Sequence, residues 1–256
     1  MSSDHIILAG GGHTHALILR RWAMHAHLRP EGQITLINRR STTIYSGMVP
    51  GLISGKYTLD EASIDLRSLS KQAGVSLLIG EILGIDINNN VIFLHDRPPI
   101  KFTLLSIDVG SETLKEGDLI NLKSRDLDMN IKPLENALKW IETLDHKNTR
   151  NKLGAITIVG AGLSGVEIAM ALRKRWPLCD LSLKANIGKP IFKFRSALQS
   201  LNIEIVNSKE ITSAPILRCT GSVGPKWLKD CGFSVNSTGR ILTTETFQVI
   251  GKSNIF

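Results

Sequence analysis

Short apolar runs that end at glycines, each followed by a helix-like stretch, set the pattern of this 256-residue chain. One run, at 6–9, leads into Gly10, and a second, at 156–159, leads into Gly160 about 150 residues later. Short runs without polar alternation are typical of buried strands in a parallel sheet. The pattern therefore predicts the same unit of strand, glycine turn and helix twice in one chain.

Further elements alternate along the sequence. Helices are predicted at 16–24, 132–142 and 166–175, the last ending before Pro177. Strands are predicted at 34–37, 77–80, 82–87, 91–94 and 181–183, with turns at 88–90 and at Pro98-Pro99. The apolar helix positions expected to face a core are Leu17, Leu19, Trp22, Ala23, Ile168, Ala169 and Leu172.

This alternation predicts an α/β protein with two doubly wound, Rossmann-like dinucleotide-binding domains and mostly parallel sheets. The first domain is expected to be discontinuous, at 1–112 and 236–256, with the final segment returning to its sheet. The second domain is expected at 131–235, and residues 113–130 form a connector.

The second glycine loop carries a complete phosphate-binding pattern. Gly160 allows a tight turn, Gly162 allows close approach of the backbone to phosphates, and Gly165 allows the helix to pack on the strand. The helix that follows presents free N–H groups and a partial positive charge to a pyrophosphate. The alternative is a glycine turn that binds no ligand.

The first glycine loop departs from that pattern at one position. Gly10 and Gly12 match the first two glycines, but His15 takes the third place, so the helix is expected to sit slightly further from the strand. Asn38 stands at the end of the next strand, where an acidic residue usually binds ribose hydroxyls. An empty or degenerate loop is the alternative here.

Several motifs together resemble a known family. In chain order they are Gly10-Gly11-Gly12-His13-Thr14-His15, Tyr45-Ser46-Gly47-Met48-Val49-Pro50-Gly51, Ile64-Asp65-Leu66, Asp108-Val109-Gly110-Ser111 and Gly160-Ala161-Gly162-Leu163-Ser164-Gly165-Val166-Glu167. They resemble the FAD-dependent pyridine nucleotide-disulfide oxidoreductases, in particular the subgroup associated with or fused to selenide, water dikinase, which is similar to type II NADH dehydrogenases. The resemblance covers nearly the whole chain.

The resemblance implies roles for individual residues. Ser46, Gly47 and Met48 are placed near the flavin ring, with a plain glycine turn as the alternative; Glu167 is placed toward the nicotinamide, with a solvated first-turn glutamate as the alternative. The implied cofactor-binding residues are Gly10, Gly12, His13, Thr14, Asn38, Arg39, Gly110, Ser111, Gly160, Gly162, Leu163, Gly165, Glu167, Lys184 and Gly221. Lys184-Ala185-Asn186 includes no carboxylate, so little preference for NADH over NADPH is expected.

The resemblance also implies differences from the family. The family continues to a Gly-Asp pair that binds the flavin, whereas this sequence stops at Phe256, so the chain is expected to be C-terminally shortened. The stretch between Val206 and Leu217 is shorter than the family's strand meander. FAD is therefore expected to bind weakly or to have been lost.

Composition removes several other classes of function. Cys179, Cys219 and Cys231 are far apart, so the dithiol of a disulfide reductase is not expected. The pairs His13/His15 and His25/His27 are a poor metal set, because positions i and i+2 do not share a helix face, and no metal is predicted. The net charge is +8, but aromatics are only 5%, which disfavours nucleic-acid binding by base stacking.

The sequence thus predicts a flavin-dependent NAD(P)H oxidoreductase that passes hydride to FAD and on to a small-molecule electron acceptor such as a quinone. No protein acid or base is assigned, because hydride transfer between stacked rings depends on orientation and water exclusion. A cytoplasmic location is expected, with at most peripheral contact with an anionic membrane. The alternative is a non-catalytic nucleotide-binding remnant that acts as a sensor or partner domain in selenophosphate synthesis.

Overall fold

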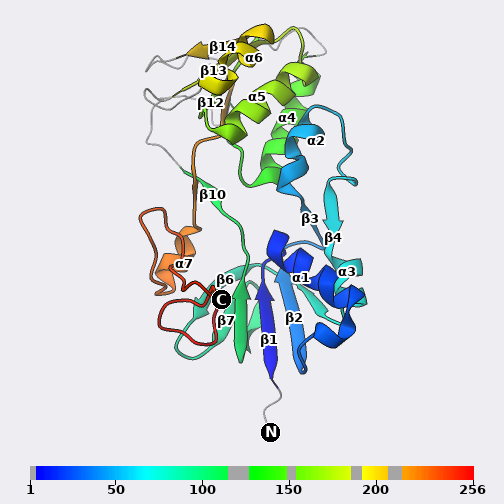
Figure 1. Ribbon diagram of the computed structural model, residues 1–256, viewed down its shortest axis with the longest axis vertical. Helices are drawn as coiled ribbons and strands as arrows, with labels where there is room; N and C mark the ends of the chain where they lie inside the picture. The colour runs from blue at the N-terminus through cyan, green and yellow to red at the C-terminus, as the bar shows by residue number, and fades with distance from the viewer. Residues whose placement is uncertain (1–3, 115–126, 149–153, 186–191, 207–214) are drawn as a thin grey trace. The chain divides into compact units, whose positions relative to one another are not determined.

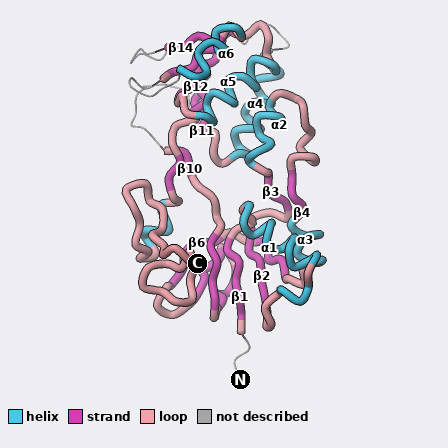
Figure 2. The backbone as a smooth tube through the Cα atoms, viewed as in Figure 1, coloured by secondary structure: helices cyan, strands magenta, loops and turns pink. Residues whose placement is uncertain are grey.

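The computed structural model describes residues 4–114, 127–148, 154–185, 192–206 and 215–256, and the chain forms two compact units (Figures 1 and 2). Unit 1 contains Met1–Tyr45, Ser63–Ser111 and Val223–Phe256, and unit 2 contains Ser46–Ala62 and Glu112–Ser222. The chain therefore enters unit 2 twice and returns to unit 1 each time, at Ser63 and at Val223.

Unit 1 is built on a four-stranded parallel sheet in the order β5-β2-β1-β9. Its strands are β1 (His5–Ala9), β2 (Gln33–Asn38), β5 (Ser76–Ile79) and β9 (Leu104–Ile107). The helices α1 (His13–Met24) and α3 (Leu66–Gln72) cover one face (Figure 1). The other face packs against an antiparallel sheet of β6 (Ile82–Asp86), β7 (Val91–Leu94) and β8 (Arg97–Lys101).

Strand β1 shows why an unbroken apolar run suits this position. Ile6 and Leu8 pack with the helices, whereas Ile7 and Ala9 pack with the antiparallel sheet. Successive side chains of a strand point to opposite faces, and both faces of this sheet are covered. Each residue of the run is therefore buried.

The final residues of the chain complete the core of unit 1. Ile255 forms a parallel bridge with Leu105, and the Ile107 N–H donates to the Phe256 carbonyl at 2.8 Å. Val249 and Ile255 are buried in the same cluster as Ile7. Figure 2 draws most of this segment as loop, and Val249 and Ile255 anchor it in the core.

Unit 2 is built on a five-stranded parallel sheet in the order β11-β15-β12-β13-β14. Its strands are β11 (Asp128–Asn130), β12 (Ala155–Val159), β13 (Asp180–Lys184), β14 (Ile203–Val206) and β15 (Ile216–Arg218). Its helices are η2 (Ser46–Met48), α2 (Val49–Ile53), α4 (Leu134–Asn148), α5 (Leu163–Arg175), η4 (Phe192–Phe194) and α6 (Arg195–Ser200).

The remaining elements are short. They are η1 (Ala26–Leu28), β3 (Thr42–Ile44), β4 (Ser63–Asp65), β10 (Glu112–Thr113), β16 (Ser222–Val223) and α7 (Lys226–Asp230). Strand β3 pairs with β4, and β10 pairs with β16. Most of the predicted connector and most of the shortened stretch after Val206 lie outside the described residues.

The predicted fold class, α/β with two parallel sheets, is confirmed, but several details differ. Pro98 and Pro99 lie in β8 and not in a turn; β8 is an edge strand, where a residue without an N–H is tolerated. Leu17 was expected to face the core but is 49% exposed. The compact units also divide the chain differently from the predicted domains, since residues 46–62 lie in unit 2 and residues 223–235 in unit 1.

A carboxylate in unit 2 holds three segments together. Asp145 on α4 accepts hydrogen bonds from the Arg175 Nε at 3.0 Å and from the indole N–H of Trp176 at 2.7 Å. The Arg175 guanidinium also donates to the Ile53 carbonyl at 2.8 Å, which connects α2 to α5. Partial burial raises the pKa of Asp145, but the hydrogen bonds from Arg175 and Trp176 outweigh that effect and hold the pKa below its usual value.

Replacing Asp145 by Ala is expected to lower the free energy of unfolding by about 3 kcal/mol, because the partly buried Arg175 and the buried Trp176 N–H both lose their acceptor. Urea denaturation at neutral pH measures this loss. Glu142→Ala, at an exposed position of the same helix, serves as the control and should change stability by less than about 0.5 kcal/mol. Equal effects of the two substitutions would contradict the assignment.

Candidate functional site

The second glycine loop connects β12 to α5 and has the geometry that the sequence predicts. Gly160 has a φ of +111°, and a Cβ there would lie 2.6 Å from the Cys219 carbonyl oxygen. A Cβ at Gly165 would collide with the Gly160 carbonyl. Both positions therefore need glycine for reasons within unit 2 itself.

Gly162 differs from these two glycines. It is the N-cap of α5, with an extended backbone, and a Cβ there would meet no described atom within 4 Å. Within the described part of the chain, no protein acceptor takes the N–H groups of residues 162–165, and no side chain caps the helix. The N-terminus of this 13-residue helix thus leaves its backbone donors available to an anion.

The first glycine loop connects β1 to α1 with the same backbone conformation at its N-cap. Gly12 has φ −71° and ψ −178°, against −73° and 175° at Gly162. Gly10 has a φ of +91°, and a Cβ there would lie 2.8 Å from the Cα of Val109. The two loops therefore share their turn geometry and differ in the side chains around them.

His15 occupies the third glycine position of the first loop and is fully buried. Its Nδ1 donates to the Gly10 carbonyl at 2.6 Å, so its Nε2 accepts from the Ser106 hydroxyl, at 2.8 Å. Burial lowers the pKa of His15, against smaller opposing effects of the Gly10 carbonyl and the Asp108 charge. The first loop thus accommodates a neutral imidazole at its third glycine position. At the corresponding position of the second loop, Gly165, even a Cβ atom would collide with the backbone.

Asp108, directly after β9, places its carboxylate at the N-terminus of α1. Its Oδ2 accepts the N–H groups of Thr14, at 2.8 Å, and of His15, at 3.2 Å. A Cβ added at Gly12 would collide with this carboxylate. The space that is open beside Gly162 is therefore filled beside Gly12.

Other donors of the first loop also have acceptors in the protein. The Gly11 N–H donates to Asn38 Oδ1 at 2.9 Å, and the Gly12 N–H donates to the Asp108 carbonyl at 3.2 Å. The Asn38 amide donates in turn to the Arg40 carbonyl, so this side chain is engaged with the loop. In this arrangement protein acceptors take the N–H groups of the first loop that a dinucleotide pyrophosphate would use.

The remaining candidates of unit 1 lie around this loop or beside it. The exposed His13 ring stacks on Tyr45, with ring centroids 5.0 Å apart. Arg39 forms an exposed ion pair with Glu81 at 3.0 Å. Gly110, at a φ of +80°, and Ser111 follow Asp108 along the chain.

The candidates of unit 2 occupy separate elements. Ser46 and Gly47 are exposed and Met48 is half-buried, and all three belong to η2 and not to a simple turn. Glu167 is exposed but is the fifth residue of α5, so the expectation that it lies in the first turn is wrong. The Lys184 carbonyl accepts the Gly160 N–H at 3.0 Å, and the Gly221 carbonyl accepts the Leu114 N–H at 2.7 Å.

The three cysteines are free thiols in separate places. Burial raises the pKa of Cys179 to about 11 and that of Cys219 to about 12. Burial also raises the pKa of Cys231, whose sulfur accepts the Ile85 N–H at 3.1 Å. Thiols with raised pKa values are poor nucleophiles near neutral pH.

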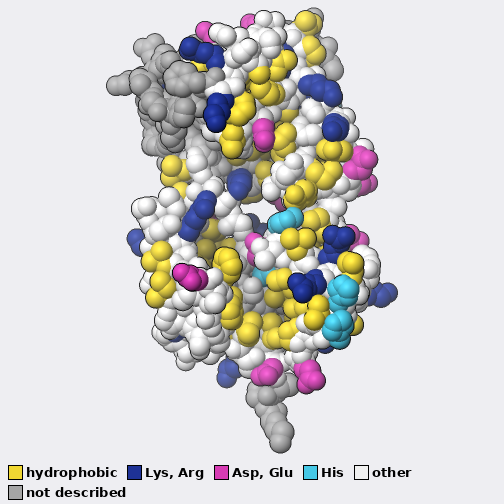
Figure 3. Space-filling view, viewed as in Figure 1, with side chains coloured by type: hydrophobic (Ala, Val, Ile, Leu, Met, Phe, Trp, Pro, Cys, Tyr) yellow, Lys and Arg dark blue, Asp and Glu magenta, His cyan; other side chains and the backbone are white. Residues whose placement is uncertain are grey.

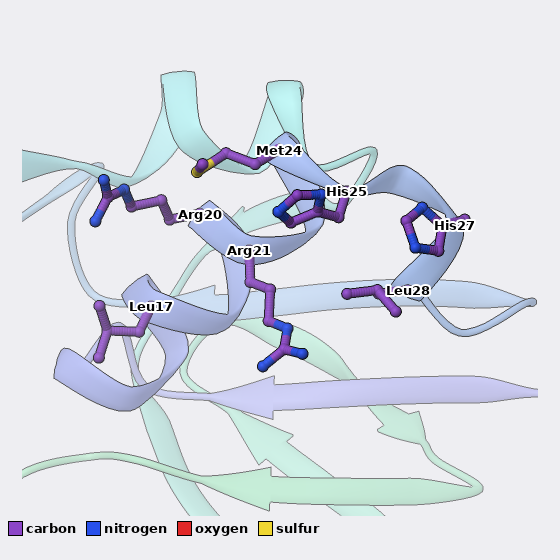
Figure 4. Close-up of a pocket in the computed structure, with 7 residues that line it drawn as sticks. All are labelled: Leu17, Arg20, Arg21, Met24, His25, His27 and Leu28. Atoms are coloured by element: carbon purple, nitrogen blue, oxygen red, sulfur yellow. The ribbon is translucent and has the colours of Figure 1, made fainter.

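A shallow hollow of about 540 Å³ lies on the outer side of α1 and η1. Figure 4 shows its lining residues: Leu17, Arg20, Arg21, Met24, His25, His27 and Leu28. Figure 3 shows histidine, basic and apolar side chains side by side on the surface of unit 1. The hollow contains no residue of either glycine loop, and His25 and His27 meet edge to face with ring centroids 6.0 Å apart.

Sequence reasoning missed the roles of Asp108 and Ser106. Asp108 was noted only as part of a motif shared with the family, and Ser106 was not noted. A signal was available, because β9 lies next to β1 in the sheet and the residues that follow parallel strands meet at one sheet edge. An acidic residue at the end of that strand could therefore be expected to reach the glycine loop.

Comparison with known proteins relates the chain to oxidoreductases, although no family model matches it. Demethylphylloquinone reductase NdbB from Synechocystis sp. is 25% identical over 98% of this chain and 69% of the relative. NADH dehydrogenase-like protein YutJ from Bacillus subtilis is 25% identical over 98% of this chain and 74% of the relative.

Solved structures show the same fold at low identity. Reduced CoADR-RHD from Bacillus anthracis has a TM-score of 0.79 at 16% identity. The match covers 100% of this chain and 50% of the CoADR-RHD chain. An NAD-dependent persulfide reductase from A. fulgidus has a TM-score of 0.78 at 15% identity. The match covers 98% of this chain and 52% of the reductase chain. NDH2 from Plasmodium falciparum, in complex with NADH, has a TM-score of 0.75 at 17% identity. The match covers 99% of this chain and 63% of the NDH2 chain.

These relatives and neighbours are NADH dehydrogenase-like and pyridine nucleotide oxidoreductases, and the fold is the FAD/NAD(P)-binding type. The chain spans about half the length of the first two structures. None of these five names includes selenide, water dikinase, so that association stays a prediction. Among the described residues, no helix has both the length and the apolar character needed to cross a membrane.

The buried His15 should make unit 1 less stable as the pH falls. Its pKa in the folded chain is below 6.5, so below that pH the unfolded chain binds a proton that the folded chain does not. The free energy of unfolding should therefore decrease from pH 7 to pH 5, by at most about 1.4 kcal/mol per pH unit from this group. Urea titrations across that range measure the slope.

His15→Gln should reduce that slope, whatever its effect on absolute stability, because the side chain no longer titrates. His27→Gln, at an exposed position, serves as the control and should leave the slope unchanged. An unchanged slope in His15→Gln would show that His15 is not responsible.

Proposed function

We propose that this chain is an NAD(P)H-dependent oxidoreductase whose second glycine loop binds the pyrophosphate of the nicotinamide dinucleotide. The observation that carries the proposal is the open N-terminus of α5 beside Gly162. Backbone N–H groups and the helix dipole at such an end favour an anion. The oxidoreductase names of the two curated relatives support the same class of activity.

Further residues of unit 2 complete this proposal. Leu163 and Ser164 are exposed at the first turn of α5, where the phosphates would approach. Lys184, at the end of β13, is proposed to lie near the ribose, and Glu167 is proposed to face the nicotinamide. We expect NADH and NADPH to bind with similar affinity, because Lys184 and Ala185 place no carboxylate against a 2′-phosphate.

FAD is the second cofactor that we propose, with Ser46, Gly47 and Met48 near its ring. When bound, FAD supplies the capacity to accept hydride and to pass electrons on to an acceptor. A quinone acceptor is proposed because one relative is named a demethylphylloquinone reductase. The absence of a paired, low-pKa cysteine set supports an enzyme that is not a dithiol reductase.

A second candidate function is a nucleotide-binding module that holds no flavin. The specific observation in its favour is Asp108, whose carboxylate takes the donors that a flavin pyrophosphate would need. Such a module would bind NAD(P)H at the second loop and act as a sensor or partner domain. The two candidates share the second loop and differ in the first.

Gly162→Val should abolish NAD(P)H binding without destabilising the chain. The extended backbone at Gly162 and the open space beside it can accept the valine, but the side chain then occupies the place of the pyrophosphate. We expect at least about a hundredfold loss of affinity, equivalent to about 2.7 kcal/mol. Fluorescence titration with NADH and with NADPH measures the loss, and thermal unfolding checks the fold.

Gly154→Val is the matched control. Gly154 lies before β12, at the other end of the strand from the loop, and it too has open space at its Cβ position. This variant should keep the affinity of the unmodified chain. Unchanged NAD(P)H binding in Gly162→Val would overturn the assignment of the second loop.

The absorption spectrum of the purified protein separates the two candidate functions. If FAD is bound weakly, the protein should be nearly colourless after dialysis. Added FAD should then show a change in its absorption bands and fluorescence on binding, and NAD(P)H oxidation should begin. A chain that binds NAD(P)H but shows neither change with excess FAD would support the flavin-free module.

A further inference from the structure

The first glycine loop already contains an anion, and that anion belongs to the protein. The Asp108 carboxylate accepts two N–H groups at the N-terminus of α1, the 12-residue helix that follows Gly12. It also fills the position that a Cβ at Gly12 would take. A phosphate at a helix N-terminus uses the same donors and the same space.

The second loop provides the internal comparison. The two N-caps, Gly12 and Gly162, have nearly the same backbone angles, and β1 and β12 are each followed by a glycine with positive φ. The difference lies in what stands beside the helix N-terminus. Asp108 stands beside α1, whereas no described atom lies within 4 Å of the corresponding position at Gly162.

We propose that Asp108 is a specificity determinant of the first loop: its carboxylate competes with the pyrophosphate of FAD for the α1 N-terminus and thereby keeps FAD binding weak. This inference rests on the proposed function, because it concerns the cofactor assigned to that loop. FAD binds only when the Asp108 side chain has left the two N–H groups. A nicotinamide dinucleotide at the second loop meets no such competitor.

The charge of Asp108 makes the competition stronger than steric exclusion alone. A carboxylate and a phosphate at the same helix end repel each other, because both carry negative charge. His15 adds no positive charge that would offset this repulsion. Burial lowers the pKa of its imidazole, and the two ring nitrogens are engaged with Gly10 and Ser106. Removing the charge should therefore improve the site.

The test is the affinity for FAD of Asp108→Asn and of Asp108→Ser. Both residues can cap a helix without a charge, and the serine variant provides a second measurement if the asparagine variant folds poorly. All proteins carry Gly162→Val, so that FAD cannot bind at the second loop. Equilibrium dialysis against FAD gives the dissociation constants, and amide hydrogen exchange at Thr14 and His15 shows whether FAD protects this helix end.

Asp65→Asn is the matched control. Asp65 caps α3 of the same unit by accepting the N–H groups of Arg67, at 2.9 Å, and Ser68, at 3.1 Å. The substitution removes an N-cap charge at a helix that has no glycine loop. FAD affinity in this variant should stay within about twofold of the parent.

The proposal expects Asp108→Asn or Asp108→Ser to bind FAD at least about tenfold more tightly than the parent, equivalent to about 1.4 kcal/mol. Unchanged or weaker FAD binding in the Asp108 variants overturns it. A failure of the proposed function is seen separately, as absent NAD(P)H binding in the chain with Gly162 intact.

Discussion

A close backbone crossing at the glycine that follows β1, and another at the glycine that follows β12, determine the shape of the two loops. In unit 1 the chain passes Gly10 at Asp108 and Val109, and in unit 2 it passes Gly160 at Cys219 and Thr220. Neither crossing leaves room for a side chain, and both glycines have positive φ. The crossing fixes where the turn can run, and the turn fixes where the following helix begins. The position of each helix N-terminus is thus set by backbone contacts before any ligand is considered.

What each loop can bind depends on the residue that the crossing segment carries. Asp108 in unit 1 and Cys219 in unit 2 occupy corresponding positions beside the turn glycines. An aspartate there can reach the helix N-terminus and accept its N–H groups, whereas a buried thiol of raised pKa cannot do so. Two loops of one backbone geometry therefore present opposite electrostatic environments to a phosphate. A glycine motif alone describes the shape of such a site and not its charge.

The sequence predicts the architecture of this chain better than it predicts the site. The buried strands β1 and β12, the helix after each, and Ile168, Ala169 and Leu172 on the inner face of α5 follow from apolar periodicity, because burial on defined faces imposes that periodicity. Leu17 and Pro98-Pro99 were misjudged because exposure at a helix surface and pairing at a sheet edge depend on tertiary neighbours. Asp108 lies 96 residues after Gly12 in the sequence (108 − 12), and no local pattern reports a contact made by strand order.

The grouping of residues 46–62 with unit 2 also depends on contacts between residues that are far apart in the sequence. The Ile53 carbonyl accepts a hydrogen bond from Arg175, a partner 122 positions away. The predicted domain boundary followed chain continuity, whereas the observed one follows this long-range packing of α2 against α5. The functional roles proposed for Ser46, Gly47 and Met48 thus belong to residues of unit 2.

The discontinuity of unit 1 has a consequence for biosynthesis. β1 is synthesised before Val249 and Ile255, and these two side chains belong to the same core cluster as Ile7 and Leu105. Unit 2 has all its residues by Ser222 and can fold while the core of unit 1 still lacks Val249 and Ile255. For that interval Ile7 and Leu105 have only part of the packing that surrounds them in the complete unit. An early strand of unit 1 therefore reaches its full packing only when residues of the 223–256 segment have been made.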